Sequence, residues 1–350
     1  MLLFGGQSAE HDVSRATAVA VARALDPAKY DVVPVGIATD GRWLLAGDAQ
    51  RMLAAGRDAL PAAFAVEGDV VAVPSASRSD DIDVVIPLLH GPYGEDGTVQ
   101  GLLELAGLPY VGAGVLGSAV AMDKVTMKQL LTGAGLETAR AVIMRDGQSV
   151  DEFVRRTEGD LGFPCFVKPA NMGSSVGVTK VRTSPELRDA IAHAFTYDEW
   201  ILAEEMVRGR EIEVGILGDD PAVASLPGEV VPAADFYDYA DKYEDGKAEL
   251  RAPAPLSSEQ IAEVQLLAVR AFEACRGEAM ARVDFFLRDD GVFVVNELNT
   301  IPGFTPISMY PRLWEVSGVP YADLLDRLID LAISRAQRRA ARRGRQRRPG

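Results

Sequence analysis

The first part of the chain alternates short apolar runs with helical periodicity. Residues 2–4 predict a strand, a Gly-Gly turn follows, and the positions 13, 16, 20 and 24 predict one apolar face of a helix. Residues 32–37 predict a second strand, and the nearly continuous apolar run 83–89 is typical of a parallel strand covered on both faces. Residues 44–80 are the least regular stretch. This pattern predicts an α/β unit with a Rossmann-like sheet.

The rest of the chain predicts further α/β structure with antiparallel strands. The predicted elements are, in order, a helix at 123–131, a strand at 141–143, a helix from 150, a strand that ends at 168, strands at 200–204, 212–217 and 222–231, a helix at 258–275, strands around 284 and 294, and a helix from 321. The polar stretch 234–249 is longer than an ordinary connection. Loops of that size are commonly lids over a site.

Composition narrows the class of protein. The 350 residues are 48% hydrophobic and 25% charged, which is an ordinary globular balance for two or three domains. We see no membrane span and no signal peptide, so we expect a cytoplasmic protein. The two cysteines, Cys165 and Cys275, have no partner at metal-ligand spacing, which excludes a disulfide framework and predicts two core thiols.

Charge is unevenly spread along the chain. The net charge is −15, although the last sixteen residues hold eight arginines and no acid. A body this acidic repels phosphate backbones, so we expect no nucleic-acid partner. The segment 335–350 is predicted to be a solvated, disordered extension of the last helix, and removal of everything after Arg335 is predicted to have little effect.

A predicted hairpin carries the most informative chemistry. Asp-Gly at 290–291 between β-branched and aromatic runs favours a two-residue turn. With that turn, Asp284 faces Glu297 and Arg282 faces Asn299, and all four side chains share one face of the sheet. Opposed carboxylates destabilise a ladder by up to about 1 kcal/mol unless a cation lies between them. The pattern fits equally well a solvated outer face of the sheet, on which the two carboxylates repel each other only weakly.

If this face of the hairpin is a metal site, the chemistry of its ligand atoms indicates which metal it binds. Asp284, Glu297 and Asn299 offer oxygen ligands only, which suit Mg²⁺ rather than zinc. Arg282 on the same face is placed to stabilise a developing anion.

A Gly/Ser-rich loop follows the strand that ends at Lys168. Backbone N–H groups of the loop 173–177 and the lysine together can hold nucleotide phosphates. The order is not that of a P-loop, in which the lysine follows the glycines and opens a helix. An ordinary Gly-Ser turn between strands is the alternative.

Two further residues lie at predicted element ends. Glu10 and Asp12 at the start of the first helix oppose a phosphate there, so Glu10 fits a substrate ammonium or serves only as a helix cap. His90 directly follows the apolar run 83–89, where carboxyl ends of strands face a ligand crevice. It is placed for a substrate carboxylate, or it orders its loop.

Six motifs, in order along nearly the whole chain to about residue 334, resemble the D-alanine–D-alanine ligases of the ATP-grasp superfamily. They are GGQSAEHDVS at 5–14, HGPYGEDGTVQGLLELAGLPYVGAG at 90–114, MDK at 122–124, VKPANMGSSVGV at 167–178, YDYADKY at 237–243, and RVDFF at 282–286 with NELNTIPGFTPIS at 296–308. The first strand begins close to Met1 and is expected to be shorter than in relatives. Residues 44–80 match no motif, and Met309 stands where several relatives have leucine.

The resemblance implies an α/β ATP-grasp fold with an N-terminal Rossmann-like (pre-ATP-grasp) domain, three α/β domains in all. The implied segments are 1–112 for the N-terminal substrate domain, 113–204 for the central domain, 205–334 for the C-terminal domain with its lid 234–249, and 335–350 for the tail. ATP is expected between the central and C-terminal domains.

The resemblance also implies roles for single residues on the nucleotide side. Lys124, Lys168 and Lys242 would contact phosphates under the loop Ser174-Ser175, Glu204, Glu205 and the backbone of Val207 would read adenine, and Glu211 would bind ribose. Asp284, Glu297 and Asn299 would hold two Mg²⁺, with Mn²⁺ as the other metal.

On the substrate side the resemblance implies two D-alanine positions. Glu10 would hold the ammonium of the first D-alanine and His90 would lie near its carboxylate. Ser308 and the backbone near Met309 would hold the second carboxylate. The remaining implied roles are a hydrogen-bonded chain of Glu10, Ser174 and Tyr243 that fastens the lid, and an oxyanion site formed by Arg282 and the backbone of Gly303.

The implied activity is ATP-dependent ligation of two D-alanines through an acyl phosphate. Such a ligase serves peptidoglycan synthesis, cell wall biogenesis and cell shape, and it is expected to be a cytoplasmic homodimer. One alternative is another ATP-grasp carboxylate ligase, such as a D-alanine–D-lactate ligase, which Lys242-Tyr243 disfavours. A non-catalytic nucleotide-binding scaffold is the other, and the presence of Lys168, Arg282 and Glu297 argues against it.

Overall fold

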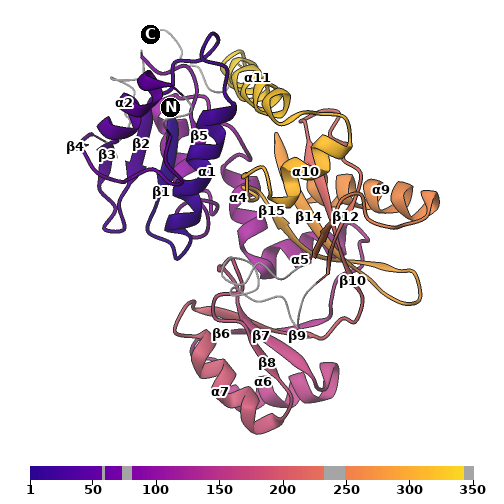
Figure 1. Cartoon of the computed structure of the whole chain (residues 1–350). Helices are drawn as coiled ribbons and strands as arrows, with labels where there is room; N and C mark the ends of the chain where they lie inside the picture. Colours follow the sequence, from indigo (N-terminus) through magenta and orange to yellow (C-terminus); the bar gives the residue numbers. More distant parts are fainter. Residues whose placement is uncertain (57–59, 73–80, 232–248, 343–350) are drawn as a thin grey trace.

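The computed structural model describes residues 1–56, 60–72, 81–231 and 249–342, which form three sheets (Figure 1). Strand order is β4-β3-β2-β1-β5 in the N-terminal sheet, β6-β9-β7-β8 in the central sheet and β13-β12-β10-β14-β15 in the C-terminal sheet, where β11 also pairs with β10. No helix in these ranges is both long enough and apolar enough to cross a membrane. The predicted lid lies outside the described residues except for Glu249, its last residue, and so do the segments 57–59, 73–80 and 343–350.

The N-terminal sheet is the predicted Rossmann-like unit. Its elements are β1 (Leu2–Gly5), α1 (His11–Ala24), β2 (Pro34–Ile37), β3 (Trp43–Leu45), α2 (Gly47–Ala55), β4 (Asp69–Val70), β5 (Ile86–Pro87) and α3 (Thr98–Ala106). β1 is parallel to both β2 and β5. Leu2 and Phe4 are buried in one apolar cluster and Leu3 in another, so this sheet is covered on both faces.

Three details of this unit differ from the prediction. The buried face of α1 contains Ser14, Ala18 and Val21 rather than positions 13, 16, 20 and 24. Ser14 faces inward because its Oγ accepts from Gly5 N at 2.8 Å and donates to Leu88 O at 2.5 Å, joining two strand ends. The predicted strands 32–37 and 83–89 are shortened to β2 and β5, and the stretch 44–80 contains α2 and β4.

The central sheet is antiparallel throughout. Its elements are α4 (Val115–Met122), α5 (Lys124–Gly133), β6 (Ala141–Arg145), α6 (Val150–Arg156), a π-helical turn η2 (Thr157–Leu161), β7 (Cys165–Pro169), β8 (Thr179–Val181), α7 (Ser184–Ala194) and β9 (Trp200–Glu205). Helices α6 and α7 cover its outer face (Figure 1). Helices α4 and α5 pack instead against the C-terminal sheet, since Val120 and Met127 belong to its core. One face of the central sheet is thereby left for a ligand.

The C-terminal sheet confirms the predicted antiparallel strands. Its elements are β10 (Arg210–Leu217), β11 (Val223–Ala224), β12 (Gly228–Val231), β13 (Glu249–Arg251), α9 (Ser258–Ala274), β14 (Met280–Leu287), β15 (Phe293–Asn299), α10 (Met309–Val316) and α11 (Tyr321–Ala340). Both cysteines are buried free thiols, as predicted.

The β14–β15 hairpin has the predicted register at its functional end but not the predicted turn. Asp284 faces Glu297 and Arg282 faces Asn299, while Leu287 faces Phe293. The loop is 289–291, closed by the bond from Arg288 N to Val292 O at 3.0 Å, with Gly291 at φ +86°. A three-residue loop shifts the register by one, and the extra residue Asn296 on β15 shifts it back.

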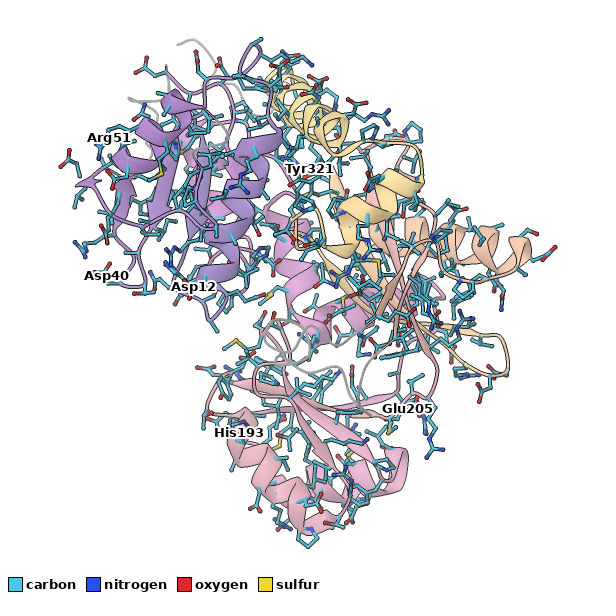
Figure 2. All side chains as sticks on the ribbon, viewed as in Figure 1. Asp12, Asp40, Arg51, His193, Glu205 and Tyr321 are labelled. Carbon is cyan, nitrogen blue, oxygen red and sulfur yellow. The ribbon has the colours of Figure 1, made fainter. Side chains whose placement is uncertain are left out.

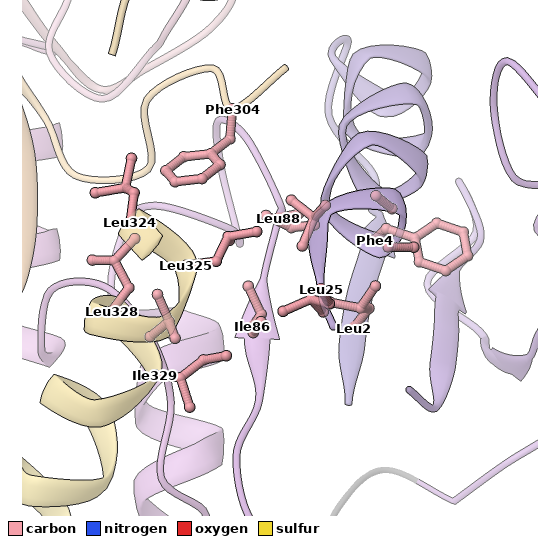
Figure 3. Packing of buried hydrophobic residues seen from close by; sticks show 14 of the residues in the cluster. Leu2, Phe4, Leu25, Ile86, Leu88, Phe304, Leu324, Leu325, Leu328 and Ile329 are labelled. Carbon is pink, nitrogen blue, oxygen red and sulfur yellow. The ribbon is translucent and has the colours of Figure 1, made fainter. Parts of the chain in front are cut away.

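Helix α11 returns to the N-terminal unit (Figure 3). Leu325, Leu328 and Ile329 share one apolar cluster with Leu2 and Ile86 from the first sheet. The chain therefore closes its N-terminal core with its last helix.

The predicted disorder from residue 335 is wrong for the part that is described. Arg335 is buried, donates to Gly112 O and Tyr110 O at 2.6 Å each, and lies over the Tyr110 ring. Arg339 binds Glu104 at 2.6 Å and Glu278 at 2.7 Å. These arginines are ordered because each one meets carbonyls or carboxylates of other elements.

Ending the chain after Arg335 is therefore expected to destabilise it, by roughly 1–2 kcal/mol, because the lost Arg339 is three-quarters buried between two carboxylates. Ending it after Arg342 keeps α11 whole and is expected to leave the melting temperature unchanged. Thermal unfolding of both truncations against the full chain measures the difference. Equal melting temperatures for all three would contradict a stabilising role for residues 336–342.

Candidate active site

A cleft of about 480 Å³ lies between the central and C-terminal sheets. Most of the residues predicted from the sequence for the nucleotide and metal line it, namely Lys124, Lys168, Ser174, Ser175, Glu204, Glu205, Val207, Glu211, Arg282, Asp284 and Glu297. Glu205, at the end of β9, is labelled in Figure 2 on the side of the central sheet that faces β10. Lys242 and Tyr243 lie outside the described residues.

The floor of the cleft is a buried carboxylate between two lysines. Lys168 on β7 donates to Oε2 of Glu204 on β9, and Lys128 on α5 lies 2.7 Å from Oε1. Burial by itself would raise the pKa of Glu204, but the two ammonium groups outweigh it and lower that pKa to about 2. Lys128 was not predicted from the sequence, although its position one turn after Lys124 on a predicted helix was a usable signal.

The Gly/Ser loop holds an unusual backbone. Ser174 and Ser175 have φ of +49° and +58°, which L residues rarely adopt and which the surroundings must enforce. Lys124 donates to the loop carbonyl of Met172 at 2.5 Å. Ser174 donates to Glu10 Oε1 at 2.6 Å, so the loop is joined to the N-terminal unit. The structure thus brings Glu10 and Ser174 together, as predicted.

His90 is buried beside that junction. Its Nδ1 lies 3.1 Å from Ile301 O and 3.9 Å from Glu95 Oε1, and within the described part of the chain its Nε2 has no hydrogen-bond partner. Burial would lower the pKa of His90, but Glu95 and Glu10 outweigh burial and raise it. Sequence analysis did not identify Glu95, which lies in the loop after His90.

The acidic face of the hairpin, which was predicted to hold a metal through Asp284, Glu297 and Asn299, is partly neutralised by an arginine. Arg282 binds both oxygens of Asp284 at 2.7 Å and lies 3.1 Å from Glu213 Oε2, and Asn299 Nδ2 donates to Asp284 Oδ2 at 2.8 Å. Burial would lower the pKa of Arg282, but Asp284 and Glu213 outweigh it and raise that pKa. Glu213, opposite Asp284 on β10, is a further acid that sequence analysis missed.

The donor set of this face fits a hard divalent cation. Asp284 and Glu297 are opposed across the ladder, with the amide of Asn299 beside Asp284. In the ranges that the structure describes, no group of three or more His, Cys, Asp or Glu side chains is placed to hold a metal. The candidate set is therefore two carboxylates and one amide.

The loop after β15 brings together the other substrate candidates. Ser308 occupies the N-cap position of α10, but its side chain makes no capping hydrogen bond, and its Oγ lies 2.7 Å from Thr305 Oγ1. A Cβ at Gly303 would approach Ser308 Oγ to 3.1 Å, so glycine permits this close contact. Met309 is buried at the start of α10. Ile301 O of the same loop contacts His90, so the loop after β15 of the C-terminal sheet meets the loop after β5 of the N-terminal sheet here.

Comparisons with known proteins agree with this arrangement. Family models described as the D-ala D-ala ligase N-terminus and C-terminus match residues 1–113 and 130–330. D-alanine–D-alanine ligases of Geobacillus thermodenitrificans and Streptomyces griseus are 49% and 48% identical, each over 96% of this chain and 95% and 92% of the relative.

Solved structures give the same result. The D-alanine-D-alanine ligase of Coxiella burnetii is 38% identical with a TM-score of 0.84, and covers 97% of this chain and 94% of its own. The VanG D-Ala:D-Ser ligase of Enterococcus faecalis is 34% identical with a TM-score of 0.82. The match covers 95% of this chain and 98% of that ligase.

Proposed function

Since the chain belongs to the D-alanine–D-alanine ligase family, we propose how its side chains carry out the ATP-dependent ligation of two D-alanines to D-alanyl-D-alanine. It is a ligase with the ATP-grasp fold, it uses ATP and a divalent metal, and its product serves peptidoglycan synthesis. The observation that carries the proposal is the contact of Ser174 with Glu10, because it joins a phosphate-binding loop to a carboxylate suited to an amino acid.

In this proposal the cleft holds ATP. Lys124, Lys168 and Lys242 contact the phosphates, and Ser174 and Ser175 close over them. Glu204, Glu205 and the Val207 backbone lie at the adenine, and Glu211 at the ribose. The domain limits 1–112, 113–204 and 205–334 follow from the same proposal, with ATP between the last two.

The acidic face of the hairpin is proposed as the metal site. Asp284, Glu297 and Asn299 hold two Mg²⁺, for which Mn²⁺ can substitute. Bound there, the metal neutralises charge on the phosphates during transfer. Arg282 donates two hydrogen bonds to Asp284, which hold its guanidinium in position. Together with the Gly303 backbone, Arg282 faces the tetrahedral oxyanion.

The amino acids occupy the junction of the three sheets. Glu10 binds the first ammonium, His90 lies at the first carboxylate, and Ser308 with the Met309 backbone binds the second carboxylate. The raised pKa of His90 favours its cationic form, which suits a carboxylate. Tyr243, through Ser174 and Glu10, fastens the lid.

The reaction then has two steps. The first D-alanine carboxylate attacks the γ-phosphate, which forms an acyl phosphate and releases ADP. The deprotonated amine of the second D-alanine attacks the acyl carbon and expels phosphate. Exclusion of water protects the acyl phosphate between the steps.

Phosphate release from ATP with D-alanine, L-alanine or D-lactate as the sole added substrate tests the proposal. Of these three compounds, we expect only D-alanine to cause phosphate release. Release with D-lactate and D-alanine together, in excess of that with D-alanine, would favour the ester-forming ligase instead. We further propose a homodimer in the cytoplasm, where ATP is supplied, and light scattering of the purified chain tests the dimer.

Ser174→Ala is expected to raise the KM for the first D-alanine by about tenfold, because Glu10 loses a charge-assisted hydrogen bond of about 1.5 kcal/mol that orients it. The KM for ATP should rise less than threefold. Steady-state kinetics with each substrate varied in turn measures both constants. A rise in the KM for ATP alone would show that Ser174 serves only the nucleotide.

A further inference from the structure

Lys128 is a buried cation for which the proposed reaction has no role. It lies on α5, four residues after Lys124, and its side chain is 8% exposed. Lys124 lines the cleft, whereas Lys128 is not among the lining residues. Burying an ammonium group is costly unless it is paired, so its partner indicates what it does.

That partner is a residue of the cleft. Lys128 Nζ lies 2.7 Å from Glu204 Oε1, while its nearest carbonyl contact, Ala139 O, is 3.4 Å away. Lys168 binds the other oxygen of the same carboxylate. Glu204 is 5% exposed, so water screens neither ion pair well. Lys128 therefore acts on the cleft through Glu204.

Lys128, Lys168 and Glu204 form a buried trio whose net charge affects how strongly the cleft binds an anionic ligand. Lys168 and Glu204 alone form a neutral pair, whereas the trio keeps one net positive charge. Glu297, which acts on Lys168 from the opposite sheet, adds a further negative charge nearby. Without Lys128, Lys168 would be the one counter-ion left to Glu204 among the residues that the structure describes, and the floor of the cleft would lose its excess positive charge.

We propose that Lys128 is a positioning residue of the nucleotide site: by sharing the Glu204 carboxylate it fixes Glu204 and leaves Lys168 available to phosphate. This inference rests on the proposed binding of ATP in the cleft. It assigns to Lys128 an effect on nucleotide affinity with no contact to the nucleotide, and no effect on D-alanine.

The test is the affinity for ADP, measured by calorimetry on the full chain. Lys128→Met is expected to raise the Kd for ADP about tenfold, because Glu204 would then pair with Lys168 more strongly and leave that lysine less available to the phosphates. In steady-state kinetics the KM for ATP should rise by a similar factor, and the KM for D-alanine and kcat should change less than about threefold. Lys128→Arg keeps the charge and should restore most of the affinity.

Two further variants separate this role from a structural one. Lys29→Met removes an exposed lysine that pairs with Asp326 at 2.7 Å, far from the cleft, and should leave the Kd unchanged. Lys128→Gln keeps a hydrogen-bond donor for Glu204 but removes the positive charge. It replaces Lys128→Met in the measurement if Lys128→Met folds poorly. It too should raise the Kd.

A double-mutant cycle decides whether Glu204 is the intermediary. In a Glu204→Gln background, Lys128→Met should change the Kd for ADP less than about threefold, because the shared carboxylate is gone. An unchanged Kd in folded Lys128→Met and Lys128→Gln, or the same tenfold change in both backgrounds, would overturn the inference. Failure of the nucleotide assignment looks different, because Lys168→Ala would then bind ADP as the wild type does.

Discussion

Replacement of Glu297 by glutamine is expected to lower kcat at least about a hundredfold, equivalent to roughly 2.7 kcal/mol of lost transition-state stabilisation. The substitution keeps the shape of the side chain and removes one of the two carboxylates opposed across the β14–β15 ladder. The fold should survive, because it relieves a like-charge contact with Asp284. Turnover measured across a range of Mg²⁺ concentrations, with circular dichroism as the check on folding, tests this expectation.

Asp290→Asn is the control for Glu297→Gln. Asp290 is an exposed acid in the loop of the same hairpin, so its neutralisation should leave kcat unchanged. If Glu297→Gln kept near-normal turnover at limiting Mg²⁺, this face could not be the metal site.

Arg282→Lys is expected to lower kcat by about a hundred- to a thousandfold, the usual loss when a donor to a developing oxyanion is removed. Lysine keeps the charge but lacks the planar fork that binds both oxygens of Asp284 and lies near Glu213. The lysine ammonium would then pair with either Asp284 or Glu213 and would no longer lie close to the reacting carbon. The Kd for ADP should change less than about threefold, since the lost contact is made in the transition state.

The same strand offers a matched control for Arg282→Lys. Arg288 binds Asp290 two residues later, as Arg282 binds Asp284, but this second pair is exposed and outside the cleft. Arg288→Lys should leave kcat unchanged. A thousandfold loss accompanied by an equal loss of ADP affinity would place Arg282 in nucleotide binding instead.

The shared face of Asp284, Glu297, Arg282 and Asn299 could be predicted from the sequence because period-two alternation constrains a hairpin strongly. The pairing of Asp284 with Glu297 was correct although the turn was not, since the loop and the bulge at Asn296 shift the register in opposite directions. Alternation sets which face a side chain occupies, whereas a bulge leaves no pattern in hydrophobicity. The predicted register at Asp284 and Arg282 was therefore correct, whereas the predicted turn was wrong.

Contacts between distant elements could not be predicted in the same way. Lys128 and Glu204 lie on a helix and a strand that are far apart in the chain, and the spacing of Lys128 from Lys124 does not indicate which carboxylate it pairs with. Ser14 lies off the predicted apolar face of its helix, and Arg335 lies in the predicted solvated tail, yet both are buried and donate hydrogen bonds to carbonyls. A buried polar group depends on its partner, and sequence pattern alone does not locate partners.

The return of α11 to the first sheet has a consequence for synthesis on the ribosome. Leu2 and Ile86 emerge early, but Leu325, Leu328 and Ile329, which complete their cluster, are made last (Figure 3). Domains ordinarily fold in the order in which they are made. Here the N-terminal unit keeps an open apolar face until residues 325–329 have been made, so we expect it to need chaperone protection for longer than a domain that completes its own core.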